Sequence, residues 1–334
     1  MHLDIENSAQ LIPYLRQTHR ISISDVPKIT MLTGGVANKT ILVEHTNSAF
    51  VMKQALGKFR VSVDWFVQPQ RSHLEVLGLQ TYGQLCPSGS VPKFLFEDEA
   101  NFIHAMSAIP QPHENYKTLL LRGQGSTELI QQYAALMAHV HKEAFAREIE
   151  LRPMFDDLQY FESQRLEPFY AYTAQQVLEA RTFIHALIED TRRTQLTLVH
   201  ADFTPKNILV YEGKLVLLDF EIVHWGDPAF DAGLALAHLL AKTAYIGTQD
   251  SLNHAQLFAS DYVSAFVEHS LGVGLETRLI RHTLACLLAR VRGKSQMDYL
   301  DEQQKSWITE WVVREMREVP STVLELCRKF SDLV

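Results

Sequence analysis

The feature that most constrains this chain is a polar segment followed by two short apolar runs. The runs cover residues 208–211 and 214–218, and a Glu-Gly pair separates them. This pattern predicts a two-stranded ribbon with a tight turn. Because such a ribbon folds back on itself, Asn207 at its start and Asp219 at its end are expected to lie side by side.

The polar side chains around this ribbon are those that phosphoryl transfer needs. An acceptor hydroxyl requires a carboxylate that orients it and takes its proton, and nucleotide phosphates require a magnesium ion held by hard oxygen ligands. Asp202, in the loop before the ribbon, is the predicted catalytic residue. Asn207 and Asp219 are predicted metal ligands. Glu221 is a third candidate ligand, which could bind metal or substrate.

The order of these residues resembles the pattern of the aminoglycoside phosphotransferase and choline kinase-like superfamily. The motif is H-x-D-x-x-x-x-N from His200 to Asn207, followed by the hairpin and by D-x-E. The resemblance implies an α+β, two-lobed protein-kinase-like fold with an antiparallel-sheet N-lobe and a mostly helical C-lobe. It also implies ATP and Mg²⁺ as cofactors and a small-molecule alcohol as substrate. Phe-Glu after Asp219, in place of Phe-Gly, argues against a protein kinase.

Composition excludes several other classes of protein. A chain of 334 residues with 46% hydrophobic content can form two cores, and its net charge of −8 disfavours nucleic acid as a partner. No apolar run approaches the ~18 residues of a membrane span, and the first residues do not resemble a leader, so we expect a cytoplasmic protein, monomeric or homodimeric. Three isolated cysteines indicate neither a zinc site nor a disulfide framework.

Two regions differ in their hydrophobic pattern. Residues 1–107 are expected to form a nucleotide-binding lobe, and residues 108–334 a helical lobe with the catalytic loop, metal site and substrate pocket. Short strands are predicted in the first region at 28–32, 40–44, 49–53, 91–96 and 102–106, with a helix at 71–82. Helices are predicted in the second at 126–146, 155–165, 171–194, 228–246, 252–270, 275–293 and 302–332.

The predicted N-lobe contains residues suited to a nucleotide. Gly34 and Gly35, with Asn38, lie in the turn between the first two strands, where backbone N–H groups could approach phosphate oxygens. Lys53 is placed to bind the α- and β-phosphates, and Glu75 on the following helix could hold the lysine through an ion pair.

The fold resemblance further implies that the segment 102–107, including His104 and Met106, offers backbone groups to an adenine ring. The N-lobe is also similar to methylthioribose kinases, in V-M-K-Q-A, in F-R-V-S-V-D-W and in R-S-H-L-E. The likeness fades in the catalytic core. The acceptor therefore stays open between a methylthioribose-like sugar, an amino alcohol such as choline, and an aminoglycoside.

Four residues are candidates for contact with the acceptor. Trp65 and Trp225 could line the cleft or fill a core, while Arg290 and Arg292 could bind a substrate carboxylate or phosphate or only complement a helix dipole. A catalytically inactive nucleotide-binding scaffold is the alternative of another class. The joint presence of the lysine, the two aspartates and the asparagine argues against it.

Overall fold

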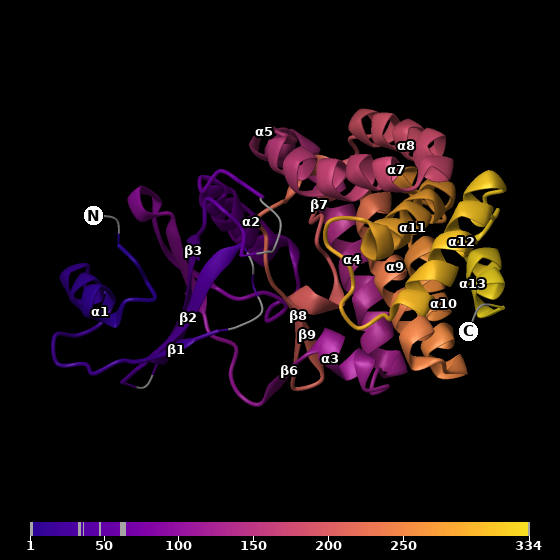
Figure 1. Cartoon of the computed structure of the whole chain (residues 1–334). Coiled ribbons are helices and arrows are strands. Elements are labelled where there is room, and N and C mark those ends of the chain that lie inside the picture. Colours follow the sequence, from indigo (N-terminus) through magenta and orange to yellow (C-terminus); the bar gives the residue numbers. More distant parts are fainter. Residues whose placement is uncertain (1–2, 33–34, 36, 47, 61–64, 333–334) are drawn as a thin grey trace.

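A five-stranded antiparallel sheet, in the order β1-β2-β3-β5-β4, forms the N-terminal lobe (Figure 1). The computed structural model describes residues 3–32, 35, 37–46, 48–60 and 65–332, so the predicted Gly34 lies outside the described residues. The elements of this lobe are α1 (Ser8–Gln17), β1 (Lys28–Met31), β2 (Asn38–His45), β3 (Ser48–Ala55), α2 (Arg71–Leu85), β4 (Phe94–Asp98), the 3₁₀ turn η1 (Glu99–Asn101) and β5 (Ile103–Ser107).

The two faces of this sheet pack against different helices. Phe50 and Met52 of β3 are buried in a cluster that includes Leu11 and Leu15 of α1. Because side chains alternate along a strand, Lys53 projects from the opposite face, where α2 packs. The five strands and α2 confirm the predicted elements, whereas α1 was not predicted. Helix α1 has few apolar positions, so its sequence pattern is weak. Packing of Leu11 and Leu15 against the sheet stabilises it.

The C-terminal lobe is mostly helical. Its first half contains β6 (His113–Asn115), α3 (Tyr116–Leu121), α4 (Thr127–Ala146), α5 (Glu148–Phe155), α6 (Gln159–Phe161), the π-helical segment η2 (Glu162–Ala171), α7 (Tyr172–Gln176), η3 (Leu178–Ala180) and α8 (Arg181–Arg193). Its second half contains β7 (Thr197–Val199), η4 (Pro205–Asn207), β8 (Ile208–Tyr211), β9 (Lys214–Leu217), β10 (His224–Gly226), α9 (Pro228–Ile246), α10 (Gln249–Ser264), η5 (Ser270–Gly272), α11 (Leu275–Arg292), α12 (Glu302–Arg317) and α13 (Val323–Ser331).

The helix predictions for this lobe were correct where no turn interrupts the apolar pattern. The predicted helix 155–165 instead crosses the non-helical residues 156–158 and ends within the π-helical segment η2. The predicted helix 171–194 is broken near Val177, and the predicted helix 302–332 is broken between α12 and α13, where Pro320 cannot continue a helix. Within the described part of the chain, none of the helices combines the length and the apolar character needed to cross a membrane.

Helix α9 is the centre of the C-lobe and is buried along almost its whole length (Figure 1). It packs directly on α11 at Gly233, where an added Cβ would lie 2.5 Å from the Cβ of His282 and 2.9 Å from the backbone nitrogen of Thr283. Cβ atoms do not approach so closely, so only glycine lets the two helices meet here.

We expect Gly233→Ala to destabilise the protein by about 1–3 kcal/mol, because α9 and α11 must move apart to accommodate the methyl group. The matched control is Gly83→Ala on α2, where the nearest atom to an added Cβ is 3.9 Å away. That change should stabilise by up to about 1 kcal/mol through helix propensity. Urea unfolding of both variants measures the difference, and equal effects would contradict the close packing at Gly233.

Candidate active site

The hairpin formed by β8 and β9 brings the predicted polar residues together. The strands pair from Ile208 opposite Leu217 to Tyr211 opposite Lys214. Directly beyond the ladder, the Leu218 backbone N–H donates to the Asn207 carbonyl over 2.9 Å. Asn207 and Asp219 therefore lie next to each other at the open end of the hairpin, which confirms the predicted proximity.

Asp202 is fixed on both of its carboxylate oxygens. Arg165 of η2 contacts Oδ1 at 3.0 Å, and Asn207 donates through Nδ2 to Oδ2 at 2.8 Å. Burial alone would raise the pKa of Asp202, but the positive charges of Arg165 and Lys206 outweigh it and hold the pKa below its usual value. The carboxylate is thus ionised at neutral pH and held in one orientation.

The loop that carries Asp202 is supported from below by a buried carboxylate. Asp231, in the first turn of α9, accepts hydrogen bonds from the backbone N–H groups of His200 (2.8 Å) and Ala201 (2.7 Å). Asp231 therefore fixes the backbone of the loop just before Asp202. Ala201 has φ of +61°, a left-handed conformation that favours glycine.

His200 links this loop to the hairpin. Its Nε2 lies 3.1 Å from the Leu218 carbonyl, and its Nδ1 accepts the Asp202 backbone N–H at 3.2 Å. Burial lowers the pKa of His200, which keeps the ring neutral so that one nitrogen can donate and the other accept.

Lys53 joins the N-lobe to the hairpin of the C-lobe. Its ammonium group forms an ion pair with Glu75 of α2 and another with Asp219, the latter at 2.6 Å. Burial lowers the pKa of Lys53, but Asp219, Glu75 and Glu221 outweigh it and raise the pKa above its usual value. The predicted Lys53–Glu75 pair is therefore present.

Glu221 is engaged by the N-lobe. Its Oε2 accepts from Arg71 Nε at 2.9 Å and from Asn38 Nδ2 at 3.3 Å. The Arg71 side chain is fully buried, and its remaining nitrogens donate to backbone carbonyls at three points of the N-lobe, in Ala37, Leu56 and Gln68. The Asn38 side chain thus faces Glu221 and Arg71 in the interior.

Three carboxylates in this centre could together hold a metal ion. Glu75, Asp219 and Glu221 each have an oxygen within 4.8 Å of the other two. These are hard oxygen ligands of the kind that Mg²⁺ prefers, and Asn207 lies next to Asp219 across the hairpin. The residues present therefore fit a magnesium site, to which sequence reasoning did not assign Glu75.

Comparison with known proteins places the chain in a family. A model of the phosphotransferase enzyme family matches residues 28–266. The chain belongs to this family. Methylthioribose kinase 2 of Oryza sativa subsp. japonica is 23% identical over 285 residues, which cover 75% of this chain and 66% of that relative. The match thus spans slightly less than two thirds of the relative's length.

Solved structures of similar proteins have the same fold. Amicoumacin kinase hAmiN, in complex with AMP-PNP, Ca²⁺ and Ami, superposes with a TM-score of 0.58 at 13% identity, covering 88% of this chain and 89% of that one. ADP-bound aminoglycoside phosphotransferase APH(2'')-Ib has a TM-score of 0.53 at 15% identity, covering 93% and 99%. The predicted two-lobed protein-kinase-like fold is confirmed.

The prediction that His104 and Met106 offer backbone groups to an adenine ring needs correction. Both residues lie in β5, which is paired with β3 on one edge and with β4 on the other. The ladders use the backbone groups of this strand, so they are not free for a ligand. The His104 side chain instead lies between Ser72, at 3.2 Å, and Glu75, at 3.6 Å.

The candidate acceptor residues separate into different environments. Trp225 is fully buried in the core of the C-lobe and cannot contact a substrate, which corrects that prediction. Arg292 faces α12, where its Nε donates to Thr309 at 2.9 Å and its Nη1 lies 3.6 Å from Glu302. Trp65 packs on Phe59, with ring centroids 5.1 Å apart.

Arg290 lies on the other side of α11 from Arg292. Its guanidinium carbon is 5.6 Å from the ring centroid of Phe169, and the guanidinium of Arg165 lies over the same ring at 5.0 Å. Because Arg165 is the partner of Asp202, Arg290 is close to the predicted catalytic residue. Sequence reasoning missed Arg165 entirely, since a single arginine in a helical stretch carries no signal.

Proposed function

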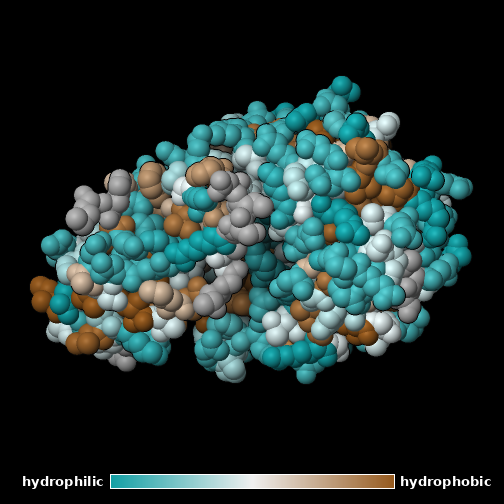
Figure 2. Space-filling model, viewed as in Figure 1, coloured by the Kyte–Doolittle hydropathy of each residue, from teal (hydrophilic) through white to brown (hydrophobic). Residues whose placement is uncertain are grey.

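We propose that this protein is an ATP-dependent kinase that transfers the γ-phosphate to a hydroxyl group of a small metabolite. The observation that carries the proposal is the convergence of Lys53, Asp219, Asn207 and Asp202 on the cleft between the lobes. Figure 2 shows a recess between the lobes whose C-lobe side is mainly hydrophilic. Membership of the phosphotransferase family and the neighbours bound to ADP and AMP-PNP support the choice of nucleotide.

In the proposed reaction, the acceptor oxygen forms a bond to the γ-phosphorus, and the bond from phosphorus to the β–γ bridging oxygen breaks. The electron pair of that bond leaves on ADP, and the hydroxyl proton passes to Asp202. With its lowered pKa, Asp202 is a weak base, suited to orienting the hydroxyl and accepting the proton late. Arg165 and Asn207 hold its carboxylate in place.

The residues that would hold the nucleotide and its metal come from both lobes. We assign phosphate binding to Lys53 and to the backbone of Gly35, between β1 and β2, and metal binding to Asp219 and Asn207. Magnesium, when bound, neutralises charge on the phosphate oxygens. Glu75 holds Lys53 in position. A methylthioribose-like sugar is a candidate acceptor because curated relatives of the chain are methylthioribose kinases.

We expect the protein to release ADP and form a phosphorylated product with ATP, magnesium and one member of a panel of hydroxyl compounds, detected by mass spectrometry. Lys53→Met should reduce this turnover at least about 10²-fold, because the phosphates lose their buried cation. Lys28→Met is the control, since Lys28 is an exposed residue of the same sheet. Nucleotide binding without acceptor-dependent ADP release across the panel would instead favour the scaffold alternative.

A further inference from the structure

Basic side chains from separate elements of the C-lobe gather near Asp202, where the charge of Lys206 acts on the Asp202 carboxylate and the Asp202 charge acts on Arg290. This cationic cluster comprises Lys117 of α3, Lys206 of η4, Lys242 of α9 and Arg290 of α11, and the neutral His238 of α9 lies among them.

Contacts between the elements place these side chains together. Asn115, at the start of α3, donates to the Lys206 carbonyl at 2.7 Å. The ammonium groups of Lys117 and Lys242 lie 5.5 Å and 5.6 Å from the ring centroid of Tyr299. The positive charges of Lys242, Arg290, Lys117 and Lys206, together with burial, lower the pKa of His238 and keep its ring neutral.

Lys206 acts on Asp202 and Asp219, but Lys117, Lys242 and Arg290 have few acidic partners within the described residues. Lys242, which is 2% exposed, donates only to the carbonyl of His238 in its own helix, at 3.2 Å. Arg290 donates to the Ser295 hydroxyl at 2.8 Å, and its buried Nε has no partner. Lys117 has one acidic partner, Asp298, at 3.4 Å, and that side chain is 83% exposed.

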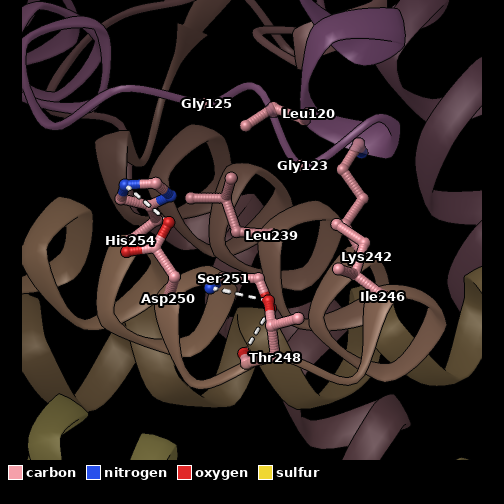
Figure 3. Close-up of a pocket in the computed structure, with 10 residues that line it drawn as sticks. All are labelled: Leu120, Gly123, Gly125, Leu239, Lys242, Ile246, Thr248, Asp250, Ser251 and His254. Carbon is pink, nitrogen blue, oxygen red and sulfur yellow. Dashed lines mark hydrogen bonds and ion pairs between the residues drawn. The ribbon is translucent and has the colours of Figure 1, made fainter.

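The other acidic residue near Lys242 is turned to a different partner. Asp250 lines the cavity between the α3–α4 turn, α9 and α10 that Lys242 also lines, but it lies 3.9 Å from His254. In Figure 3, Lys242 extends toward Gly123, on the opposite side of this cavity from Asp250 and His254. Among the residues that the structure describes, none supplies a carboxylate paired with this ammonium group.

By contrast, the cations of the nucleotide centre are all paired with carboxylates. Lys53 has Glu75 and Asp219, and Arg71 has Glu221. Burying an unpaired charge costs free energy. In a buried basic group this cost lowers the pKa, because the neutral form is favoured over the charged form. Burial, together with Lys117 and Arg290, lowers the pKa of Lys242 to about 7, and burial lowers the pKa of Arg290. An anionic ligand would offset this cost.

We propose that the cationic cluster binds an anionic group of the acceptor, so that the substrate is a small hydroxylated carboxylate or phosphate ester. The hydroxyl group of this substrate rests on the proposed kinase function. Its anionic group is inferred from the cationic cluster alone. Arg290 and Arg165 lie over the same Phe169 ring and Arg165 pairs with Asp202, so an acceptor of a few carbons could reach both the cluster and the catalytic carboxylate. Cationic acceptors such as choline or an aminoglycoside would be repelled.

Two pairs of probes that differ only in charge test this proposal: D-glycerate against glycerol, and ribose 5-phosphate against ribose. We expect calorimetry to detect binding of at least one anion and much weaker binding of its neutral partner. Arg290→Gln should weaken anion binding about 10–100-fold, because a charge-assisted hydrogen bond is lost. Arg292→Gln, on the same helix but facing α12, should leave it unchanged. The carboxylate and phosphate arms distinguish the two sources of negative charge.

Lys242→Met is a second variant, in case Arg290→Gln fails to fold, and it adds a pH readout. Only the protonated ammonium attracts an anion, so the affinity for D-glycerate should fall as pH rises from about 6 to about 9, while the glycerate carboxylate stays ionised. The groups facing Lys242 are Lys117 of α3, Arg290 of α11 and Tyr299, with Asp250 and His254 of α10 across the cavity. The Lys242→Met variant should lose this pH dependence.

The binding and turnover measurements separate the two proposals. Anion binding that depends on Arg290 or Lys242 supports the cationic cluster even if no phosphorylated product forms, in which case only the kinase proposal fails. Equal binding of the charged and neutral probes, or efficient phosphorylation of choline or an aminoglycoside, would overturn the anion proposal. A preference for anions that Arg290→Gln and Lys242→Met both leave intact would also overturn it.

Discussion

Replacing Asp202 with asparagine is expected to lower kcat by about 10²–10⁴-fold, the range typical of a lost general base. The amide cannot accept the hydroxyl proton, and its NH₂ group would face either Arg165 or the donating Asn207, which now both contact carboxylate oxygens. Acceptor-dependent ADP release measures the loss.

Nucleotide affinity should change by only a few fold in this variant, because Asp202 is not among the partners of Lys53. Binding of AMP-PNP checks this expectation. Asp190→Asn serves as the control, since Asp190 pairs with Arg281 at 2.7 Å on the surface, and half of its side chain is exposed. Turnover by the Asp202→Asn variant near that of this control would remove Asp202 from the mechanism.

The second large effect is expected for Asp231→Asn, which should destabilise the protein by about 3–5 kcal/mol. Asp231 is fully buried and accepts from two backbone N–H groups, and His141 lies 3.3 Å from the same carboxylate. An amide can accept from one N–H group, but its NH₂ group then confronts the other. One buried N–H group is left without a hydrogen-bond acceptor, which lowers the free energy of unfolding.

Urea unfolding measures this destabilisation, and the same Asp190→Asn protein is the reference, because an exposed ion pair contributes about 0–1 kcal/mol. Any Asp231→Asn protein that folds should also show a lower kcat, since His200 and Ala201 set the position of Asp202. A variant as stable as the reference would show that the catalytic loop does not depend on Asp231.

The parts of the site that are local in sequence could be predicted from the sequence. Asn207 and Asp219 flank one hairpin, whose apolar runs and turn determine their proximity. Lys53 and Glu75 could be paired because a strand and the next helix follow a recognisable order. Arg165 could not be found, because its contact with Asp202 depends on the packing of a π-helical segment that is distant in the chain.

Other errors have specific physical causes. His104 and Met106 were placed in a ligand-binding hinge, but strand pairing on both edges of β5 occupies their backbone. Arg290 and Arg292 lie two residues apart on one helix and so point about 200° apart. Only one of them could face the cleft, and the sequence does not indicate which. Lys242 is buried by the packing of α3, α9, α10 and α11, which are far apart in the chain. The sequence around Lys242 therefore does not predict its burial.

The Arg71–Glu221 contact also affects the net charge of the proposed nucleotide site. Glu75, Asp219 and Glu221 contribute three negative charges, and Lys53 and Arg71 contribute two positive ones, so the described centre is left with a formal charge of −1. Without Arg71 that charge would be −2. The arginine therefore acts as a counterion that halves the formal negative charge of this centre.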